Sequence, residues 1–219
     1  MKNVKVAAVM LTVGVMMAMA SGRVLADDRD LVGVLTGDGY ENEYFGVKCA
    51  LSWDYTIQCR SALQPEDPLD IINESNSDAT IDLLKSEIDL GNATVFTATA
   101  SNEVDNMVIS IASPGIGYET WDSEEAVAFG SLDSVRENLE NTGVEQDLDV
   151  ANIEVDVTQV DFLGEKHSGL EYSCTVNGIP VYGKSVILIS DDSQYVFFLE
   201  TLALDQATIS DMLSSFTKL

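Results

Sequence analysis

The sequence has few positive charges. Only 11 of its 219 residues are Lys or Arg, against 37 Asp or Glu, and the formal net charge is −26. A protein that binds nucleic acid or an anionic membrane surface needs clustered cations, so this balance argues against both kinds of partner. The acidity leaves two interpretations open, which are a solubilising surface and the binding of divalent cations or a basic partner.

Residues that build common catalytic and metal centres are also scarce. His167 is the only histidine, and the three cysteines lack the short paired spacing of a zinc site. There is no Gly-x-Ser-x-Gly sequence, and the acidic pairs lack the spacing of a calcium-binding EF-hand loop. His167 falls in a predicted turn at 164–169, where a solvated histidine is more common than a catalytic one. We therefore expect no catalytic, cofactor-binding or metal-binding residues and no enzymatic activity.

A long apolar run occurs once, near the N-terminus. Two lysines precede the uncharged segment 6–20, and small residues follow as far as Ala26. This order predicts a secretory signal peptide that is cleaved between Ala26 and Asp27, with cleavage after Ala20 as the alternative. The first cysteine, Cys49, lies far beyond the run, so no lipid anchor is indicated. We expect a secreted, extracellular protein that does not contact the membrane after cleavage.

The three cysteines leave two interpretations open. Cys49 and Cys59 lie on two strand-like runs on either side of 53–54, so a cross-strand disulfide between them is geometrically feasible. The alternative is that all three cysteines are small buried hydrophobes. Cys174 lies in an alternating run that is typical of a half-buried strand, where a core thiol is the expected role.

Periodicity predicts a leader followed by one domain. We interpret 27–39 as an acidic, flexible leader and 40–219 as the folded domain. Spacing of apolar residues and capping signals predict helices that start at 77–78, at Asp122 and at Asp205. Alternating or β-rich runs predict strands at 44–51, 55–59, 94–99, 107–111, 153–163, 170–176, 179–190 and 195–202. Because hairpins join most of these strands, the order indicates an α+β fold in which helices flank an antiparallel sheet.

Several segments resemble a known family. The stretch 40–47 leading to Trp53, the hairpin near 101, the helix before Gly143 and the stretch 160–167 are similar to secreted bacterial proteins with the PsbP-like, Mog-type sandwich. The resemblance covers roughly 40–219. It implies an α/β/α sandwich without enzymatic chemistry, because the named relatives dock onto a photosystem or a small GTPase. No functional motif of those relatives matches this chain, so their docking surfaces are not carried over.

The sequence therefore predicts a secreted, non-enzymatic binding or accessory protein that engages another extracytoplasmic protein or polymer. An acidic calcium-binding protein is the first alternative, and a secreted hydrolase without a recognised motif is the second. Converging carboxylates would favour calcium binding, and a cleft that holds His167 beside a thiol would favour the hydrolase.

Overall fold

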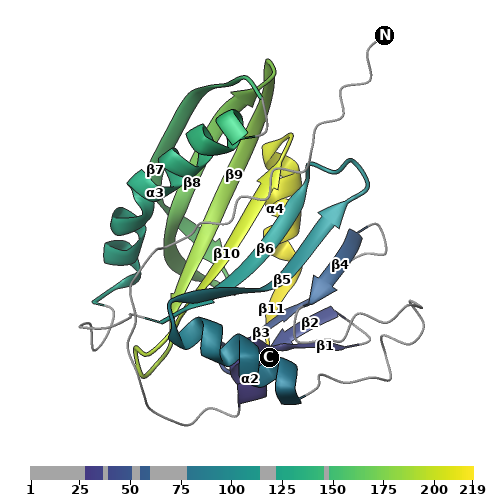
Figure 1. The fold of residues 1–219 in the computed structure, drawn as a ribbon, viewed down its shortest axis with the longest axis vertical. Helices are drawn as coiled ribbons and strands as arrows, with labels where there is room; N and C mark the ends of the chain where they lie inside the picture. The colour runs from purple at the N-terminus through teal and green to yellow at the C-terminus, as the bar shows by residue number, and fades with distance from the viewer. Residues whose placement is uncertain (1–27, 37–38, 51–54, 60–77, 114–121, 146–147) are drawn as a thin grey trace.

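A computed structural model describes residues 28–36, 39–50, 55–59, 78–113, 122–145 and 148–219, and these residues form two antiparallel sheets and four helices (Figure 1). The larger sheet has seven strands in the order β4-β5-β6-β10-β9-β8-β7, and the smaller sheet has four in the order β1-β2-β3-β11. The signal-peptide cleavage site at Ala26 and Asp27 lies outside the described residues.

The elements of the larger sheet are β4 (Tyr55–Cys59), β5 (Asn92–Ala100), β6 (Asn106–Ala112), β7 (Val150–Phe162), β8 (Glu165–Val176), β9 (Ile179–Ile189) and β10 (Val196–Ala203). Those of the smaller sheet are β1 (Val34–Thr36), β2 (Gly39–Asn42), β3 (Val47–Cys49) and β11 (Phe216–Lys218). The helices are α1 (Asp28–Val32), α2 (Asp78–Asp89), α3 (Glu124–Glu145) and α4 (Gln206–Ser214). This architecture confirms the predicted α+β class.

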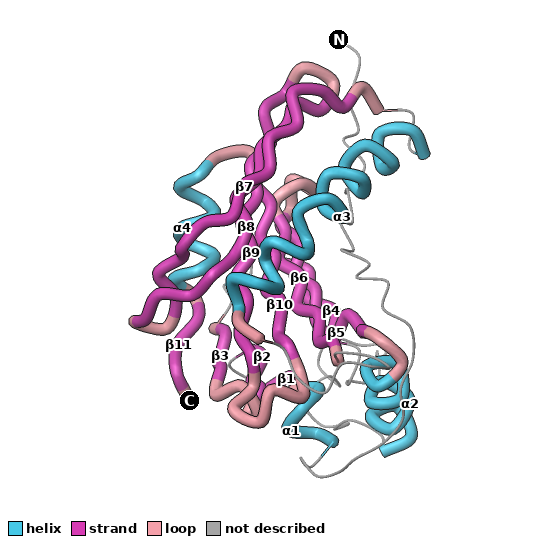
Figure 2. Tube along the Cα trace, turned by 90° about the vertical axis from the view of Figure 1, so that its left-hand side faces the viewer, coloured by secondary structure: helices cyan, strands magenta, loops and turns pink. Residues whose placement is uncertain are grey.

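The larger sheet separates two hydrophobic cores. Alternate residues of the central strand β10 enter opposite cores, and all eight residues of this strand are buried. One core joins the sheet to α3, which packs on β7, β8 and β9. The other core joins the sheet to the smaller sheet and to α2 and α4. Figure 2 shows α3 and α4 on opposite sides of the larger sheet, as in the predicted arrangement.

Helix α3 begins one residue later than its capping signals predict. The hydroxyl of Ser123, and not the Asp122 carboxylate, accepts a hydrogen bond from the backbone N–H of Ala126 at 3.1 Å. Glu124 then opens the helix, and acidic residues in a first turn interact favourably with the helix dipole. Val135 and Leu139 are buried against the larger sheet, as their spacing predicts.

The segment predicted to be a flexible leader is part of the fold. Residues 28–36 form α1 and β1, and Leu31 and Val32 of α1 are fully buried. The hydroxyl of Tyr40 donates to the Val32 carbonyl, and the side-chain amide of Asn42 donates to the Leu31 carbonyl at 2.8 Å. The leader interpretation is thus corrected from Asp28 onward. The prediction failed because the neighbouring acidic residues made the segment look solvent-exposed, although Leu31 and Val32 are buried.

The two strand runs that contain Cys49 and Cys59 do not form the predicted hairpin. Cys49 ends β3 of the smaller sheet, whereas Cys59 ends β4 of the larger sheet. Strand β3 pairs with β2 and β11, and strand β4 pairs with β5. Cys49, Cys59 and Cys174 are buried thiols outside any disulfide in this structure, which corresponds to the second interpretation of the cysteines.

Candidate functional site

A cavity of about 680 Å³ lies among α4, β11 and the far end of β7. Its polar lining consists of Gln159, Asp161, Lys184, Ser210, Ser214, Thr217 and Lys218, and its apolar lining includes Val160, Phe162, Leu213 and Phe216. These residues come from β7, β9, α4 and β11, and only the last two elements are consecutive in the sequence. The volume falls in the range of about 300–1,000 Å³ that is common for ligand sites.

The aromatic part of the lining is continuous with the core. The rings of Phe162 and Phe216 have centroids 5.4 Å apart, and both side chains are almost fully buried. They are held by packing on both sheets, so the apolar wall is rigid rather than adaptable. A ligand in the cavity would meet a fixed apolar surface below a polar rim.

Two lysines line the cavity, which is notable in a chain with so few cations. Lys218 forms an ion pair with Glu165, and the pair is exposed. Lys184 lies on β9, and its Nζ is 3.7 Å from the nearest Glu171 carboxylate oxygen, which is too long for a hydrogen bond. The Lys184 ammonium is therefore the cavity cation that is held less tightly by its own chain.

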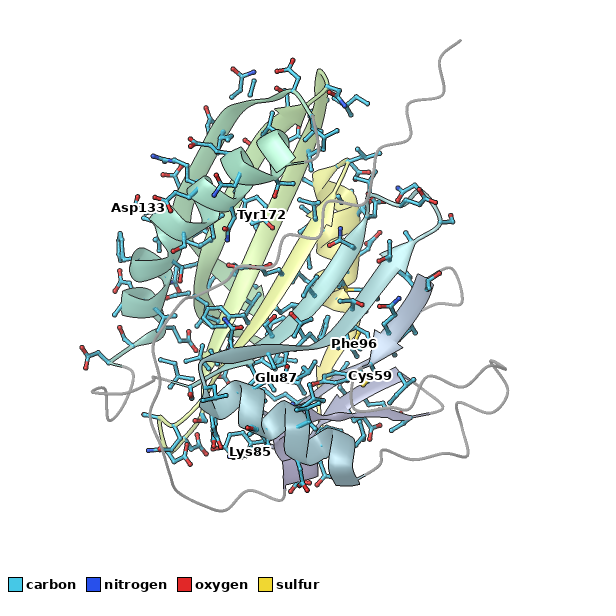
Figure 3. The ribbon with its side chains drawn as sticks, in the orientation of Figure 1. Cys59, Lys85, Glu87, Phe96, Asp133 and Tyr172 are labelled. Carbon is cyan, nitrogen blue, oxygen red and sulfur yellow. The ribbon has the colours of Figure 1, made fainter. Side chains whose placement is uncertain are left out.

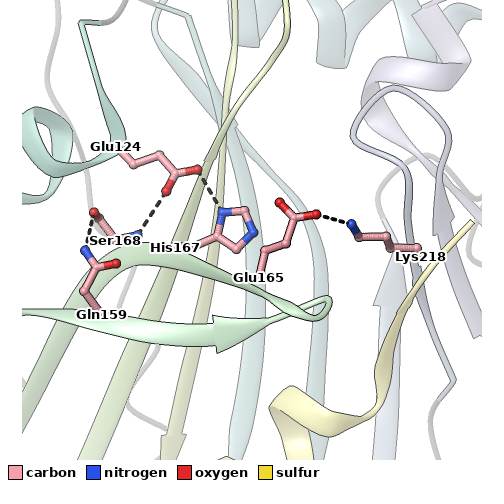
Figure 4. A network of polar contacts seen from close by, with 6 residues as sticks. All are labelled: Glu124, Gln159, Glu165, His167, Ser168 and Lys218. Atoms are coloured by element: carbon pink, nitrogen blue, oxygen red, sulfur yellow. Dashed lines mark hydrogen bonds and ion pairs between the residues drawn. The ribbon is translucent and has the colours of Figure 1, made fainter.

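A polar network adjoins the cavity and fixes the start of α3 on the larger sheet (Figure 4). One carboxylate oxygen of Glu124 lies 2.9 Å from Nδ1 of His167, and the other accepts from the backbone N–H of Ser168 at 3.0 Å. The Gln159 side-chain amide donates to the Ser168 hydroxyl at 2.9 Å. His167 is thus an ordered residue of β8, which corrects the prediction of a solvated turn histidine.

Truncation of Glu124 to alanine is expected to lower the free energy of unfolding by about 1–2 kcal/mol, because the backbone N–H of Ser168 and the His167 ring both lose their acceptor. Chemical denaturation measures this change. Glu125→Ala is the matched control, since Glu125 is the exposed neighbour in the same helical turn, and it should stay within about 0.5 kcal/mol of the parent. Equal losses in the two variants would contradict the role given to Glu124.

Two of the thiols, those of Cys49 and Cys174, are poorly suited to nucleophilic chemistry. Burial raises the pKa of Cys49 to about 11, although a hydrogen bond with the Ser215 hydroxyl opposes the shift. Burial also raises the pKa of Cys174. A thiol with a raised pKa is protonated at neutral pH and is a weak nucleophile. Among the described residues there is also no group of three His, Cys, Asp or Glu side chains that could hold a metal ion.

A second unusual group lies on the α3 side of the larger sheet. Glu200 is only 8% exposed, and burial raises the pKa of its carboxyl group to about 8. Its strand partners are Ser185 on β9 and Val108 on β6. In the described residues no hydrogen bond or ion pair reaches the Glu200 carboxyl group. Tyr172, labelled in Figure 3, is equally buried, and burial together with the nearby Glu200 raises its pKa.

The sequence did not reveal this cavity. Lys218 lies close in the sequence to the hydroxyls of α4, but Lys184 is far from both, and the Ser-x-x-Lys match that ends at Lys218 has no companion motif. The one available signal was the scarcity of cations, because in so acidic a chain a lysine is a candidate for a binding role. Of the residues singled out by sequence, Cys49 and Cys59 lie in one core and Cys174 in the other, whereas His167 pairs with Glu124.

These features define an α+β domain with an open, mixed polar and apolar cavity, and comparison with known proteins adds little to that class. No family model matches the sequence, and no curated protein matches it. One similar solved structure is LpqN, described as involved in cell envelope biogenesis of Mycobacterium tuberculosis. It is 14% identical over 78% of this chain and 82% of that one, with a TM-score of 0.34. Within the described residues, no helix has the length and hydropathy needed to cross a bilayer.

Proposed function

We propose that this chain is a non-enzymatic binding or accessory protein that acts outside the cytoplasm and engages another protein or polymer through the cavity beside α4. The observation that carries the proposal is the cavity itself, where Lys184 and several hydroxyls surround a wall formed by Phe162 and Phe216. A few placed polar groups over an apolar surface are typical of sites that bind without reacting.

The neighbouring side chains support binding rather than catalysis. A nucleophilic mechanism needs a base within hydrogen-bond reach of the nucleophile. In the described residues Nδ1 of His167 contacts the Glu124 carboxylate, and no hydroxyl or thiol is hydrogen-bonded to this ring. The predicted signal peptide supports the location, since a cleaved leader of this type directs a protein out of the cytoplasm.

Neutralising Lys184 is expected to weaken binding to the envelope of the cell that produces the protein. Purified protein would be sedimented with washed envelope material at 0.15 M salt, and saturable binding would be measured. Because a charge-assisted hydrogen bond is stronger than a neutral one, Lys184→Gln should weaken binding about tenfold. The matched control is Arg136→Gln, which removes one positive charge from the exposed face of α3.

Both variants must melt within a few degrees of the parent protein for the comparison to count. Saturable binding that Lys184→Gln weakens and Arg136→Gln leaves unchanged would support the proposed site. The absence of saturable binding, or equal weakening in the two variants, would refute it. Without saturable binding, the proposed function is wrong. With equal weakening in the two variants, the protein binds the envelope but not through the cavity.

A further inference from the structure

Strand β11 is an edge strand whose second side faces the cavity. It is the last strand of the smaller sheet, and β3 is its only strand neighbour among the residues that the structure describes. All three of its residues line the cavity, whereas no residue of β3 does. The cavity therefore lies on the side of β11 that carries no strand in the described part of the chain.

The register shows which main-chain groups face that side. The backbone N–H of Ala50 donates to the Ser215 carbonyl at 3.0 Å, and the N–H of Leu219 donates to the Gly46 carbonyl at 3.0 Å. Hydrogen-bonded pairs alternate with non-bonded pairs in an antiparallel ladder, so Thr217 and Lys48 form the bonded pair between these two contacts. The N–H and C=O groups of Phe216 and Lys218 consequently point away from β3.

These edge groups have no protein partner among the described residues. In the described ranges, the backbone hydrogen bonds made outside the helices and strand ladders involve other groups. Phe216 is nevertheless buried, at 5% exposure, and a buried backbone group needs a partner. A row of unpaired N–H and C=O groups is a template for another extended chain.

We propose that the cavity takes an extended polypeptide segment that adds a strand to the free edge of β11. The inference rests on the proposed function and names the class of its partner. Main-chain groups of the segment pair with Phe216 and Lys218, and an apolar side chain packs against Phe162. Lys184 pairs with a carboxylate of the segment, because it is the loosely held cation of the cavity.

The charge and the edge together favour a peptide over other occupants. A carbohydrate presents hydroxyls and no alternating row of N–H and C=O groups, so it would leave the β11 edge only partly satisfied. A basic segment would be attracted by the acidic chain as a whole, but Lys184 and Lys218 would repel it inside the cavity. The bound segment needs only one carboxylate, which pairs with Lys184. The rest of the partner can therefore carry positive charge.

A pair of variants at Lys218 isolates the main-chain contact. Lys218→Ala and Lys218→Pro both remove the ammonium group and its ion pair with Glu165, but only proline also removes the N–H that faces the cavity. Proline is tolerated on an edge strand when its nitrogen faces away from the neighbouring strand. Both variants should therefore fold, and their melting temperatures check this.

The probe is a mixed-sequence hexapeptide pool with acetylated N-termini and free C-terminal carboxylates, passed over the immobilised protein and measured by mass spectrometry. We expect the parent protein to retain a subset of peptides, Lys218→Ala to retain the same subset within about threefold, and Lys218→Pro to retain about tenfold less. Lys184→Gln, or amidation of the pool, should also lower retention about tenfold.

A measurement on the peptide covers the case in which Lys218→Pro does not fold. N-methylation of a retained peptide, one residue at a time, should lower affinity at every second residue, because alternate N–H groups of a strand face its partner. Retention no higher than on bare resin overturns the proposal, as does equal binding by the proline and alanine variants together with indifference to N-methylation. Envelope binding that still depends on Lys184 would in that case leave the proposed function intact with a different occupant.

Discussion

Replacing Glu200 by glutamine is expected to stabilise the protein by about 4–5 kcal/mol at pH 8.5 and to change its stability little at pH 4.5. The carboxyl group is buried without a partner among the described residues, and its pKa is raised to about 8. An unfolded glutamate ionises near pH 4.3. Glutamine has nearly the same shape and stays neutral at every pH, so it removes only the cost of ionisation.

The direction follows from proton linkage. Between about pH 4.5 and pH 8 the folded protein keeps the Glu200 proton while the unfolded chain has lost it, so stability falls as the pH rises through this window. The slope is about 1.4 kcal/mol per pH unit, and the full penalty is reached above the folded pKa. At pH 8.5 the melting temperature of the glutamine variant should therefore be about 10 °C higher than that of the parent.

Denaturant unfolding between pH 4.5 and 9 measures this difference, and Glu154→Gln provides the control. Glu154 lies exposed on the edge strand β7, so its replacement should change the free energy of unfolding by no more than about 0.5 kcal/mol. Identical pH profiles for the two glutamine variants would contradict the assignment of a neutral, buried Glu200. The parent protein could instead be more stable at pH 8 than at pH 5, with Glu200→Gln abolishing this difference. That result would contradict the assignment more strongly.

Replacing Gly183 by alanine is expected to cost about 2–3 kcal/mol of stability. A methyl group built at Gly183 would lie 1.9 Å from Cε2 of Tyr172, its partner across β8 and β9. The Tyr172 ring is 3% exposed and packs in the core beneath α3, so it cannot move into solvent. Overpacking of a filled core typically costs 1–3 kcal/mol. Urea unfolding at pH 6 measures the loss.

A double-mutant cycle tests whether the ring is the cause. In a Tyr172→Leu background, where the ring is absent, Gly183→Ala should cost less than about 1 kcal/mol, because neighbouring substitutions are not additive. Gly130→Ala is the control, since Gly130 lies in α3 with no atom within 4 Å of the added methyl group. It should stabilise by up to about 1 kcal/mol. The same cost for Gly183→Ala in both backgrounds would disprove steric conflict with the ring.

The regular elements of the larger sheet were predictable because their signals are local. Alternation identified β5 and β6, and Asn177 and Gly178 adopt positive φ angles of 52° and 78° in the predicted two-residue turn between β8 and β9. The apolar spacing of α3 was equally clear. Glu200 was also detectable in principle, as the single acid within the largely apolar segment that forms β10.

Most of the smaller sheet was not predictable, since its strands are three or four residues long, and only β3 falls within a predicted strand, 44–51. Its pairing of Phe216 with Cys49 joins segments that are far apart in the sequence. The helix predicted to start at Asp205 ends at Ser214, and Phe216 then begins β11. The cavity depends on the pairing of β11 with the distant strand β3, so a site on β11 could not be inferred from local patterns.

The position of β11 also determines when the domain can finish folding. Residues 47–49 leave the ribosome long before residues 216–218, yet the two segments are adjacent strands of one sheet. Until the later segment emerges, β3 has an unpaired edge and the wall of the cavity is missing. The larger sheet can assemble its consecutive strands β7 to β10 from neighbouring hairpins, but the smaller sheet closes only as a late, non-local event. A chain whose synthesis is not yet complete is therefore unfolded at β11, which is the strand where the mature protein is proposed to bind its partner.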